Sequence, residues 1–413
     1  MVVLRNWQKQ IINDFPAIVK QHRRFILKAP TGAGKTILAS EIVEQFYKGK
    51  KILVLCHRLV LLEQLQKALS VKHRVHKLSV SEDGKAFDGY DILLSTNMRA
   101  KDVLEEAIKM ADLIIVDEAH RVSPNGTGYK KIIDDFENEG KIGAQFMGLT
   151  ASPERRTGDQ RDQLSLAFDA IIDCANIETL IEEGILVAPI YRPHFIHDLD
   201  LSSIDISSGD FPVSKLAPAI VKSSMIDYAT FIYLEERQNV PSAPISAWFC
   251  PDVTVAEATL EKVRANGIEA EIVTASTPIN ERMELLEAHE NGAIEAMVSV
   301  GVLAEGWDNP HCNLIVHLRP TLSKVVWGQT VGRGLRSAEG KDRCIVIDVS
   351  SNWSTFGPVE KLEWSLWNHR RSYVRYKNRF NWIGEQLEQG ADEKIYFLCE
   401  NKLPNGLRCS HIY

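Results

Sequence analysis

The segment Phe25-Ile-Leu-Lys-Ala-Pro-Thr-Gly-Ala-Gly-Lys-Thr36 determines how the first half of the chain folds. It begins as an apolar run, passes through a loop with two glycines, and leads into Ile37-Leu-Ala-Ser-Glu41, which has the composition of a helix. Strand, glycine-bearing loop and helix in this order form a phosphate cradle, because glycines let backbone N–H groups turn inward and the helix N-terminus adds partial positive charge. The segment therefore predicts an α/β domain with a phosphate-binding loop.

Each residue of this loop has a predicted role in binding ATP and Mg²⁺. Lys35 supplies a mobile positive charge for the β- and γ-phosphates, and the hydroxyl of Thr36 suits Mg²⁺. Ala29 stands where the general pattern of such loops has glycine. The backbone groups predicted to surround the phosphates are those of Thr31, Gly32, Ala33 and Gly34.

A second segment, Asp112-Leu-Ile-Ile-Val-Asp117-Glu-Ala-His120, is an apolar run that ends in two acids. Acids at the end of a buried parallel strand emerge at the carboxyl edge of the sheet, where α/β proteins bind ligands. We predict that Asp117 holds Mg²⁺ and that Glu118 orients the attacking water. The alternative is a solvated strand end whose acids cap a helix. His120 is predicted to couple the nucleotide state, through hydrogen bonds, to Thr150 and Ser152.

Short β-branched apolar runs alternate with amphipathic stretches in both halves, the pattern of parallel sheets flanked by helices. The first five predicted strands are Phe25–Ala29, Lys51–Cys56, Asp91–Thr96, Asp112–Asp117 and Phe146–Thr150. The second five are Ile245–Cys250, Ala270–Ala275, Ala296–Gly301, Asn313–Leu318 and Cys344–Val349. Helices are predicted, for example, at Thr36–Tyr47 and Leu59–Leu69.

This doubled pattern predicts an α/β chain of four parts. The two domains are residues 1–187 and 243–350, and residues 188–242 form a polar connector with one helix near Leu216–Glu236. Residues 351–413 form an aromatic and basic tail.

Composition indicates an ordinary globular protein, with 413 residues, 45% hydrophobic and 25% charged. No apolar run approaches the roughly 18 to 20 residues that span a bilayer, and the N-terminus lacks a signal-peptide pattern, so no membrane partner and a cytoplasmic location are expected. The seven cysteines are mostly isolated in apolar runs, which favours small buried hydrophobes over a disulfide framework. The net charge of −7 still permits nucleic-acid binding through a local basic groove.

The order of the motifs resembles that of superfamily 2 helicases of the DEAD/DEAH-box type, and more narrowly the branch that includes RadD, phage UvsW-type and XPB-type enzymes. The resemblance covers residues 4–336. In the first half it rests on the adenine-reading glutamine segment and motifs I, II and III, at Leu4–Gln8, Ala29–Thr36, Asp117–His120 and Leu149–Pro153. In the second half it rests on motifs V and VI, at Val302–Pro310 and Gln329–Arg336.

The resemblance implies two tandem RecA-like P-loop domains with ATP between them. It implies that Arg5 and Gln8 read the adenine, and that Gly306 and Asp308 approach the ribose or phosphates. Arg333 and Arg336 would reach the γ-phosphate, and Gln329 would act in coupling. Two arginines three residues apart also fall on one face of a helix, which suits this task independently of the family. The alternative is a solvated basic helix end.

Polar residues at strand ends are predicted to contact nucleic acid, because short hydroxyl, amide and basic groups suit phosphates. The predicted contacts are His57, Arg58, Ser95, Thr96, Asn97, Phe249 and Thr274. The alternative for the hydroxyl-bearing positions is helix capping.

The tail offers two further sites. Residues 361–380 interleave aromatic and basic side chains, which suits either base stacking or, as we favour, a helix whose aromatic face packs on the second domain. Cys399, Cys409 and His411 are three candidate zinc ligands, and structural zinc takes four, so the tail is predicted to be unmetallated with an incomplete zinc ribbon as the alternative.

The sequence therefore predicts an ATP-dependent DNA helicase or translocase, with DNA favoured over RNA as its partner. Three alternatives stay open: a duplex DNA translocase of a restriction or defence system, an RNA helicase, and an ATP-gated nucleic-acid clamp. The motifs specify no protein partner.

Overall fold

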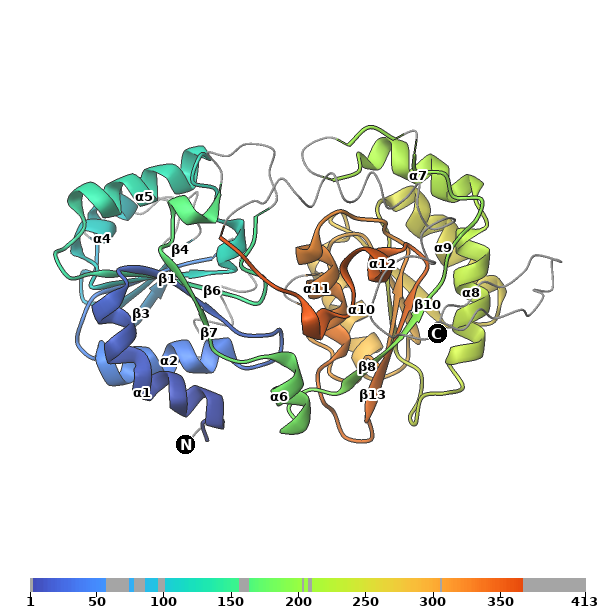
Figure 1. The fold of residues 1–413 in the computed structure, drawn as a ribbon, viewed down its shortest axis with the longest axis horizontal. Coiled ribbons are helices and arrows are strands. Elements are labelled where there is room, and N and C mark those ends of the chain that lie inside the picture. Colours follow the sequence, from blue (N-terminus) through green and yellow to red (C-terminus); the bar gives the residue numbers. More distant parts are fainter. Residues whose placement is uncertain are drawn as a thin grey trace, which may run out of the picture. The chain divides into compact units, whose positions relative to one another are not determined.

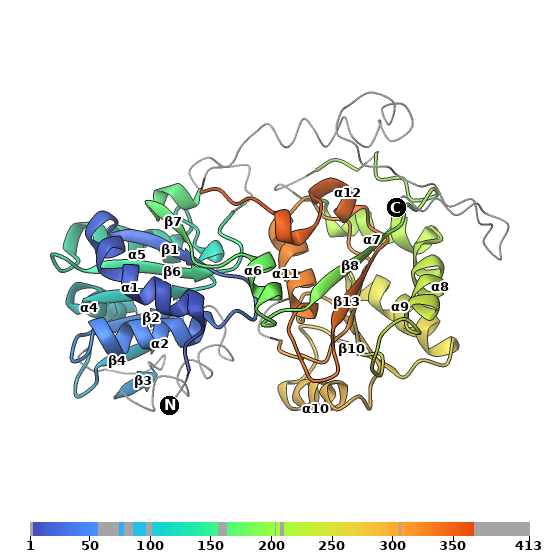
Figure 2. The same ribbon diagram turned by 60° about the horizontal axis from the view of Figure 1, so that its bottom comes forward.

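The protein consists of two α/β units, each with its own parallel sheet (Figures 1 and 2). The computed structural model describes residues 3–56, 74–77, 86–95, 101–155, 163–202, 204–206, 210–304 and 307–366. The first unit runs to Leu180 and takes back the segment that begins at Glu363, and the second unit contains Ile181–Leu362. The prediction of two parallel-sheet domains flanked by helices is confirmed.

The sheet of the first unit has the strand order β3-β4-β2-β5-β6-β1-β7, and all its pairs are parallel. Its strands are β1 (Arg24–Lys28), β2 (Ile52–Leu55), β3 (Val75–Lys77), β4 (Ile92–Ser95), β5 (Leu113–Asp117), β6 (Gln145–Thr150) and β7 (Ala170–Asp173). The central strands are rich in isoleucine, leucine and valine, which fit a sheet that is covered on both faces.

Helices cover both faces of this first sheet (Figure 1). On one face lie α1 (Asn6–Gln21) and α2 (Lys35–Phe46), and on the other lie α4 (Lys101–Met110) and α5 (Thr127–Glu139). Shorter elements are η1 (Ala119–Arg121), η3 (Leu164–Leu166) and α6 (Ile177–Glu182), the last of which begins in the first unit and ends in the second. The core beneath α4 and α5 contains Ile114, Val116, Phe146 and Phe168.

The sheet of the second unit has the strand order β10-β11-β9-β12-β13-β8, again all parallel. Its strands are β8 (Ala188–Pro193), β9 (Ser246–Phe249), β10 (Ala270–Val273), β11 (Ala296–Ser299), β12 (Leu314–His317) and β13 (Arg343–Asp348). Its helical elements are α7 (Val213–Lys222), α8 (Met225–Glu236), α9 (Val253–Ala265), α10 (Ile279–Glu290), α11 (Lys324–Gly334), α12 (Asn352–Phe356) and η4 (Val359–Lys361). A buried cluster joins α7, α8 and α9 to one face of the sheet.

All ten predicted strands exist, within two residues of the predicted bounds, and the predicted helix at Thr36–Tyr47 is α2. The predicted helix at Leu59–Leu69 lies outside the described residues. Three strands were not predicted: β3, β7 and β8. Each is a strand at a sheet edge and is at most half-buried, and β8 contains two prolines, so none carries a continuous apolar run.

The stretch 188–242, predicted to be a connector, is instead part of the second unit. Its strand β8 pairs with β13 along its whole length, from Ala188 with Arg343 to Pro193 with Asp348. The single helix predicted there is two helices, because the Asp198 carboxylate accepts hydrogen bonds from both the backbone N–H and the hydroxyl of Ser224 between α7 and α8. Polar and proline residues in this stretch therefore mark an edge strand and a helix boundary.

The described part of the tail packs on the second unit as far as Lys361. The Tyr191 hydroxyl donates to the Glu360 carboxylate at 2.7 Å, and Trp327 Nε1 donates to the Gly357 carbonyl at 3.0 Å. Farther along, Leu366 packs against the core of the first unit, and its carbonyl accepts from the N–H of Ser165. The segment 362–366 is not helical, contrary to the helix predicted over 361–380, of which the remainder lies outside the described residues. Cys399, Cys409 and His411 also lie outside them.

Gly334, at the end of α11, is required by packing. A Cβ at this position would meet Cys344 Sγ and lie 2.8 Å from Ile315 Cγ1, both on the sheet beneath the helix. We predict that Gly334→Ala lowers the free energy of unfolding of the second unit by about 1–3 kcal/mol, the usual cost of overpacking. Denaturant unfolding followed by the fluorescence of the buried Trp248 and Trp327 measures this loss.

The matched control is the double variant with Cys344→Ala, which removes one of the two clashing atoms. Its loss should be smaller than the sum of the two single losses, since the substitutions share one contact. A strictly additive pair would contradict the packing explanation.

Candidate active site

The glycine-bearing loop lies between β1 and α2, at the carboxyl edge of the first sheet. Gly32 and Gly34 have φ values of +80° and +98°, which side-chain-bearing residues rarely adopt. Gly34 is followed directly by the first residue of α2, Lys35, so the helix N-terminus opens onto the loop. Lys35 Nζ donates to the carbonyls of Ala29 and Pro30 at 3.0 and 3.1 Å. The backbone is thus shaped for an anion, and the ammonium group rests on two neutral acceptors that a phosphate would outcompete.

Arg5 and Gln8, at the start of α1, donate hydrogen bonds to carbonyls of this loop. Arg5 Nη1 donates to the carbonyls of Gly32 and Ala33 at 3.3 and 2.7 Å. Gln8 is 1% exposed, and its Nε2 donates to the Gly34 carbonyl while its Oε1 accepts from the Arg5 N–H. The structure therefore brings both predicted adenine-reading residues to the loop and gives them a second task, which is holding its carbonyls outward.

The predicted carboxylate pair lies two strands away. Asp117 ends β5, which is separated from β1 by β6, and Glu118 follows with φ +51°. Burial raises the pKa of Asp117, the neighbouring Glu118 carboxylate raises it further, and the Lys35 ammonium opposes the shift. A carboxylate that is costly to ionise alone gains most from a bound cation, so this site suits Mg²⁺.

The predicted hydrogen-bond relay exists in the structure. His120 is buried, and its Nδ1 lies 3.3 Å from Glu118 Oε2 and 3.0 Å from Thr150 Oγ1. The same Thr150 oxygen accepts from the backbone N–H of Ser152 at 3.1 Å. Glu118 is therefore connected to the segment that follows β6 through three successive contacts, from Glu118 to His120, from His120 to Thr150 and from Thr150 to Ser152. Its role in coupling stays a prediction.

In the second unit the two predicted arginines have different environments. Arg333 is 5% exposed, and its guanidinium donates to the Ala304 carbonyl through Nε and Nη2 and to the Trp307 carbonyl through Nη1. Arg336 forms an ion pair with the exposed Asp308, and its buried Nε has no hydrogen-bond partner among the described residues. Burial lowers the pKa of Arg336 to about 10.

The prediction that both arginines lie on one helix face is wrong, because α11 ends at Gly334 and Arg336 forms an isolated bridge with Leu186. Gln329 is buried within α11. Gly306 lies outside the described residues. Sequence reasoning missed His289, whose Nδ1 lies 3.2 Å from Asn309 Nδ2 and which so anchors the far end of the Val302–Pro310 segment. A lone histidine on a helix gave no signal of this contact.

The predicted nucleic-acid residues are only partly described. Ser95 and Phe249 end strands and Thr274 directly follows one, and all three are buried, so these side chains are not surface contacts in this structure. Ser276, joined to Thr274 by a hydroxyl–hydroxyl hydrogen bond of 2.8 Å, is exposed. His57, Arg58, Thr96 and Asn97 lie outside the described residues.

Within the described ranges, no group of three or more His, Cys, Asp or Glu side chains is arranged to hold a metal ion. Mg²⁺ in nucleotide sites needs fewer protein ligands, since phosphates and waters supply the others. In the same part of the chain, no helix is both long and apolar enough to cross a membrane.

Comparisons with known proteins match both units. Residues 1–155 match the family model "Type III restriction enzyme, res subunit", and residues 233–338 match "Helicase conserved C-terminal domain". A Saccharomyces cerevisiae protein named "Putative ATP-dependent helicase IRC3" is 28% identical over 361 residues, which are 84% of this chain and 51% of that protein. This chain thus spans about half the length of that relative.

Two solved structures share the fold. A fragment of a type I restriction enzyme HsdR subunit from Vibrio vulnificus YJ016, so described, has a TM-score of 0.65 at 20% identity and covers 87% of this chain and 66% of that chain. The ATP-dependent type ISP restriction-modification enzyme LlaBIII bound to DNA has a TM-score of 0.58 at 20% identity and covers 84% and 27%.

The loop geometry predicts the effect of removing its cation. Lys35→Ala should lower the rate of ATP hydrolysis by about 10²–10³-fold, because it deletes a charge preorganised against the phosphates. Phosphate release at saturating ATP measures the rate. Lys48→Ala is the matched control, since Lys48 lies beyond the far end of α2 and is 77% exposed, and it should leave the rate unchanged. Near-normal turnover by Lys35→Ala would refute the assignment of the loop.

Proposed function

This chain belongs to superfamily 2 of the helicases, and from that membership we propose that it is a motor that hydrolyses ATP to move on, or unwind, DNA. The observation that supports the proposal best is the set formed by Lys35, Asp117 and Glu118 at the carboxyl edge of the first sheet. A phosphate cradle beside two acids provides for binding a triphosphate and for attack by water.

In the proposed reaction the first unit binds the nucleotide. Backbone N–H groups of residues 31–36 surround the phosphates, and Lys35 moves from its two carbonyl acceptors to the β- and γ-phosphates. Thr36 and Asp117 would hold Mg²⁺, which neutralises phosphate charge when bound. Glu118 orients and polarises the water.

In the second unit we propose that Arg336 contacts the γ-phosphate and that Arg333 does not. All three donor-bearing nitrogens of Arg333 already point at carbonyls, so Arg333 fixes the segment between Ala304 and Trp307. Arg336 has one unsatisfied N–H and a partner, Asp308, that is 61% exposed. A buried guanidinium with an unsatisfied N–H gains more free energy from contact with a phosphate than one whose three nitrogens all have acceptors.

Movement on DNA would follow from closure of the two units around ATP and their reopening after hydrolysis. Only the closed state would place Arg336 at the nucleotide held by the first unit. The contacts from Glu118 through His120 to Thr150 would pass this change to the loops that hold DNA. Directional motion would require these loops to alternate between strong and weak binding.

A duplex DNA translocase of a restriction system is the second candidate function. It is favoured by the match of residues 1–155 to the res-subunit model. Strand separation distinguishes it from a helicase, since such a motor would move along duplex DNA without releasing a strand.

The test is the ATPase rate measured with single-stranded, duplex and forked DNA and with RNA, across a salt series. We predict that DNA stimulates the rate and that stimulation falls with salt, because binding to phosphates releases counterions. Stimulation should grow with strand length for a motor. Lys35→Ala is the inactive control.

Each of the other outcomes of this ATPase test would support one of the alternative functions or contradict the proposal. Stimulation by RNA alone would indicate an RNA helicase. Duplex stimulation without release of a labelled strand would indicate the restriction-type translocase. Stimulation that is independent of length would indicate a clamp, and no stimulation by any nucleic acid would contradict the proposal.

The arginine assignment makes a separate prediction. Arg336→Ala should lower kcat by about 10³-fold or more, the usual contribution of such an arginine, with little change in the affinity for ATP. Arg343→Ala is the matched control, because Arg343 pairs with its neighbour Asp342 at the surface. An unchanged kcat in Arg336→Ala would remove it from the reaction.

A further inference from the structure

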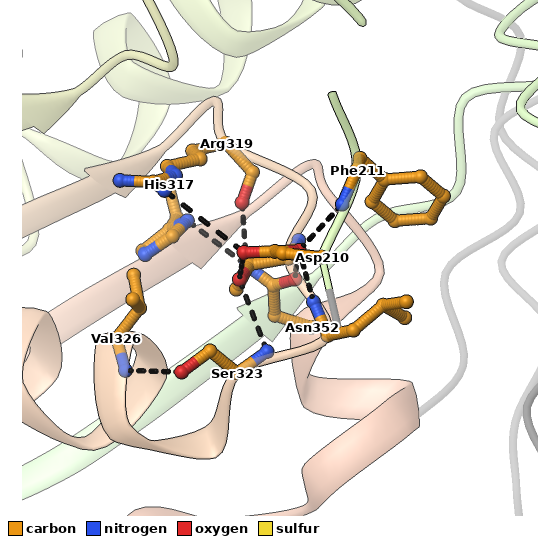
Figure 3. Close-up of polar contacts among 9 residues, drawn as sticks. Asp210, Phe211, His317, Arg319, Ser323, Val326 and Asn352 are labelled. Atoms are coloured by element: carbon orange, nitrogen blue, oxygen red, sulfur yellow. Dashed lines mark hydrogen bonds and ion pairs between the residues drawn. The ribbon is translucent and has the colours of Figure 1, made fainter. Parts of the chain in front are cut away.

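A chain of polar contacts runs through the interior of the second unit, away from the residues proposed to touch ATP. Its centre is His317, the last residue of β12, which is fully buried. On one side of the ring, Asn352 Nδ2 lies 3.0 Å from His317 Nδ1 (Figure 3). On the other side, His317 Nε2 lies 2.9 Å from Thr330 Oγ1 in α11. The chain thus joins the segment after β13 to α11 through one imidazole.

The partners fix the direction of every hydrogen bond. Asn352 Oδ1 accepts from the Thr321 N–H, so the amide nitrogen faces His317 and can only donate. His317 Nδ1 therefore accepts, and its proton lies on Nε2, which donates to Thr330 Oγ1. The Thr330 hydroxyl donates in turn to the Val326 carbonyl at 2.8 Å. His317 Nδ1 also lies 3.3 Å from Ser350 Oγ, and the Thr330 hydroxyl also lies 3.1 Å from the Trp327 carbonyl, so both groups have a second polar neighbour in the core.

Burial keeps this arrangement stable to pH. Burial, together with the smaller effect of the Arg319 cation, lowers the pKa of His317 to about 3. A second proton would have to enter on Nδ1, against the N–H of Asn352. The imidazole is therefore a neutral spacer between two elements and not a titrating group.

The loop from β12 to α11 is held from both sides by the same set of contacts. Asn352 also donates to the Arg319 carbonyl, and the Asp210 carboxylate accepts from the Thr321 hydroxyl and the Leu322 N–H (Figure 3). The helix that follows begins at a fixed place, with the Ser323 side chain as its cap. The position of α11 is thus set at its start by the loop and at its middle by Thr330.

The position of α11 matters because of the residues that this helix carries. Thr330 follows Gln329 and precedes Arg333 by one turn, and Arg333 holds the carbonyls of Ala304 and Trp307. We propose that His317 is a positioning residue, which acts through Thr330 to hold α11, and with it Arg333 and the chain that leads to Arg336, where hydrolysis needs them. This inference rests on the proposed ATPase. A buried histidine that merely satisfies the core would not link catalysis to the Thr330 hydroxyl.

Two substitutions at Thr330 separate positioning from packing. Thr330→Val keeps the shape and removes the hydroxyl, and Thr330→Ser keeps the hydroxyl. We predict that Thr330→Val lowers kcat for ATP by about ten- to a hundredfold, since small misplacement of reacting groups costs about this much. KM for ATP should stay unchanged, and Thr330→Ser should restore kcat.

Hydrogen exchange provides a readout that does not need activity. Amides of residues 324–334 should exchange faster in Thr330→Val than in the wild type, and in Thr330→Ser they should not. If the wild type has no ATPase with any nucleic acid, the proposed function fails, and the exchange data still decide whether the hydroxyl holds α11. Wild-type kcat in Thr330→Val, equal loss of kcat in both variants, or unchanged exchange would each overturn the inference.

Discussion

Both sheets are parallel and covered on both faces, and this restricts where polar side chains can lie. The β5 residues Leu113–Val116 and the β12 residues Leu314–Val316 are buried, and an unpaired polar group there would cost several kcal/mol. The first position that can carry a functional polar group is the carboxyl end of a strand. Asp117 and His317 stand at such ends, and the loop of Gly32 and Gly34 follows another. In the first unit, the phosphate loop and the two acids are thus gathered at one edge of the sheet.

Within that edge, groups are held ready by neighbours that take no part in the reaction. Arg5 and Gln8 donate hydrogen bonds to three carbonyls of the phosphate loop, which fixes the shape of its backbone. Lys35 rests on carbonyls, which are weaker partners than a phosphate, so binding exchanges poor hydrogen bonds for strong ones. Asp117 has a raised pKa because it is buried beside Glu118, and a bound cation would favour its charged form.

The sequence predicted the features that depend on local pattern. Ten strands followed from β-branched runs, and the loop followed from the spacing of its glycines. Contacts to backbone carbonyls could not be predicted, because any residue supplies a carbonyl. The bonds from Arg333 to Ala304 and Trp307 are of this kind. The burial of Ser95, Phe249 and Thr274 also escaped prediction, since the sequence shows where a strand ends but not how far its last side chains are covered by tertiary packing. The edge strand β8 was missed because its prolines resemble those of a linker.

The end of α11 explains why two arginines of one motif behave differently. Gly334 lets the helix lie against Ile315 and Cys344, Thr330 ties it to His317, and Arg333 ties it to the segment at Trp307. These three contacts leave the helix little freedom. Arg336 comes after the helix has ended, so its guanidinium is held by an ion pair to the exposed Asp308 and one long hydrogen bond to the Trp307 carbonyl. Within Gln329–Arg336, Arg333 is therefore held by more contacts than Arg336. A spacing of three residues alone does not make the two arginines equivalent.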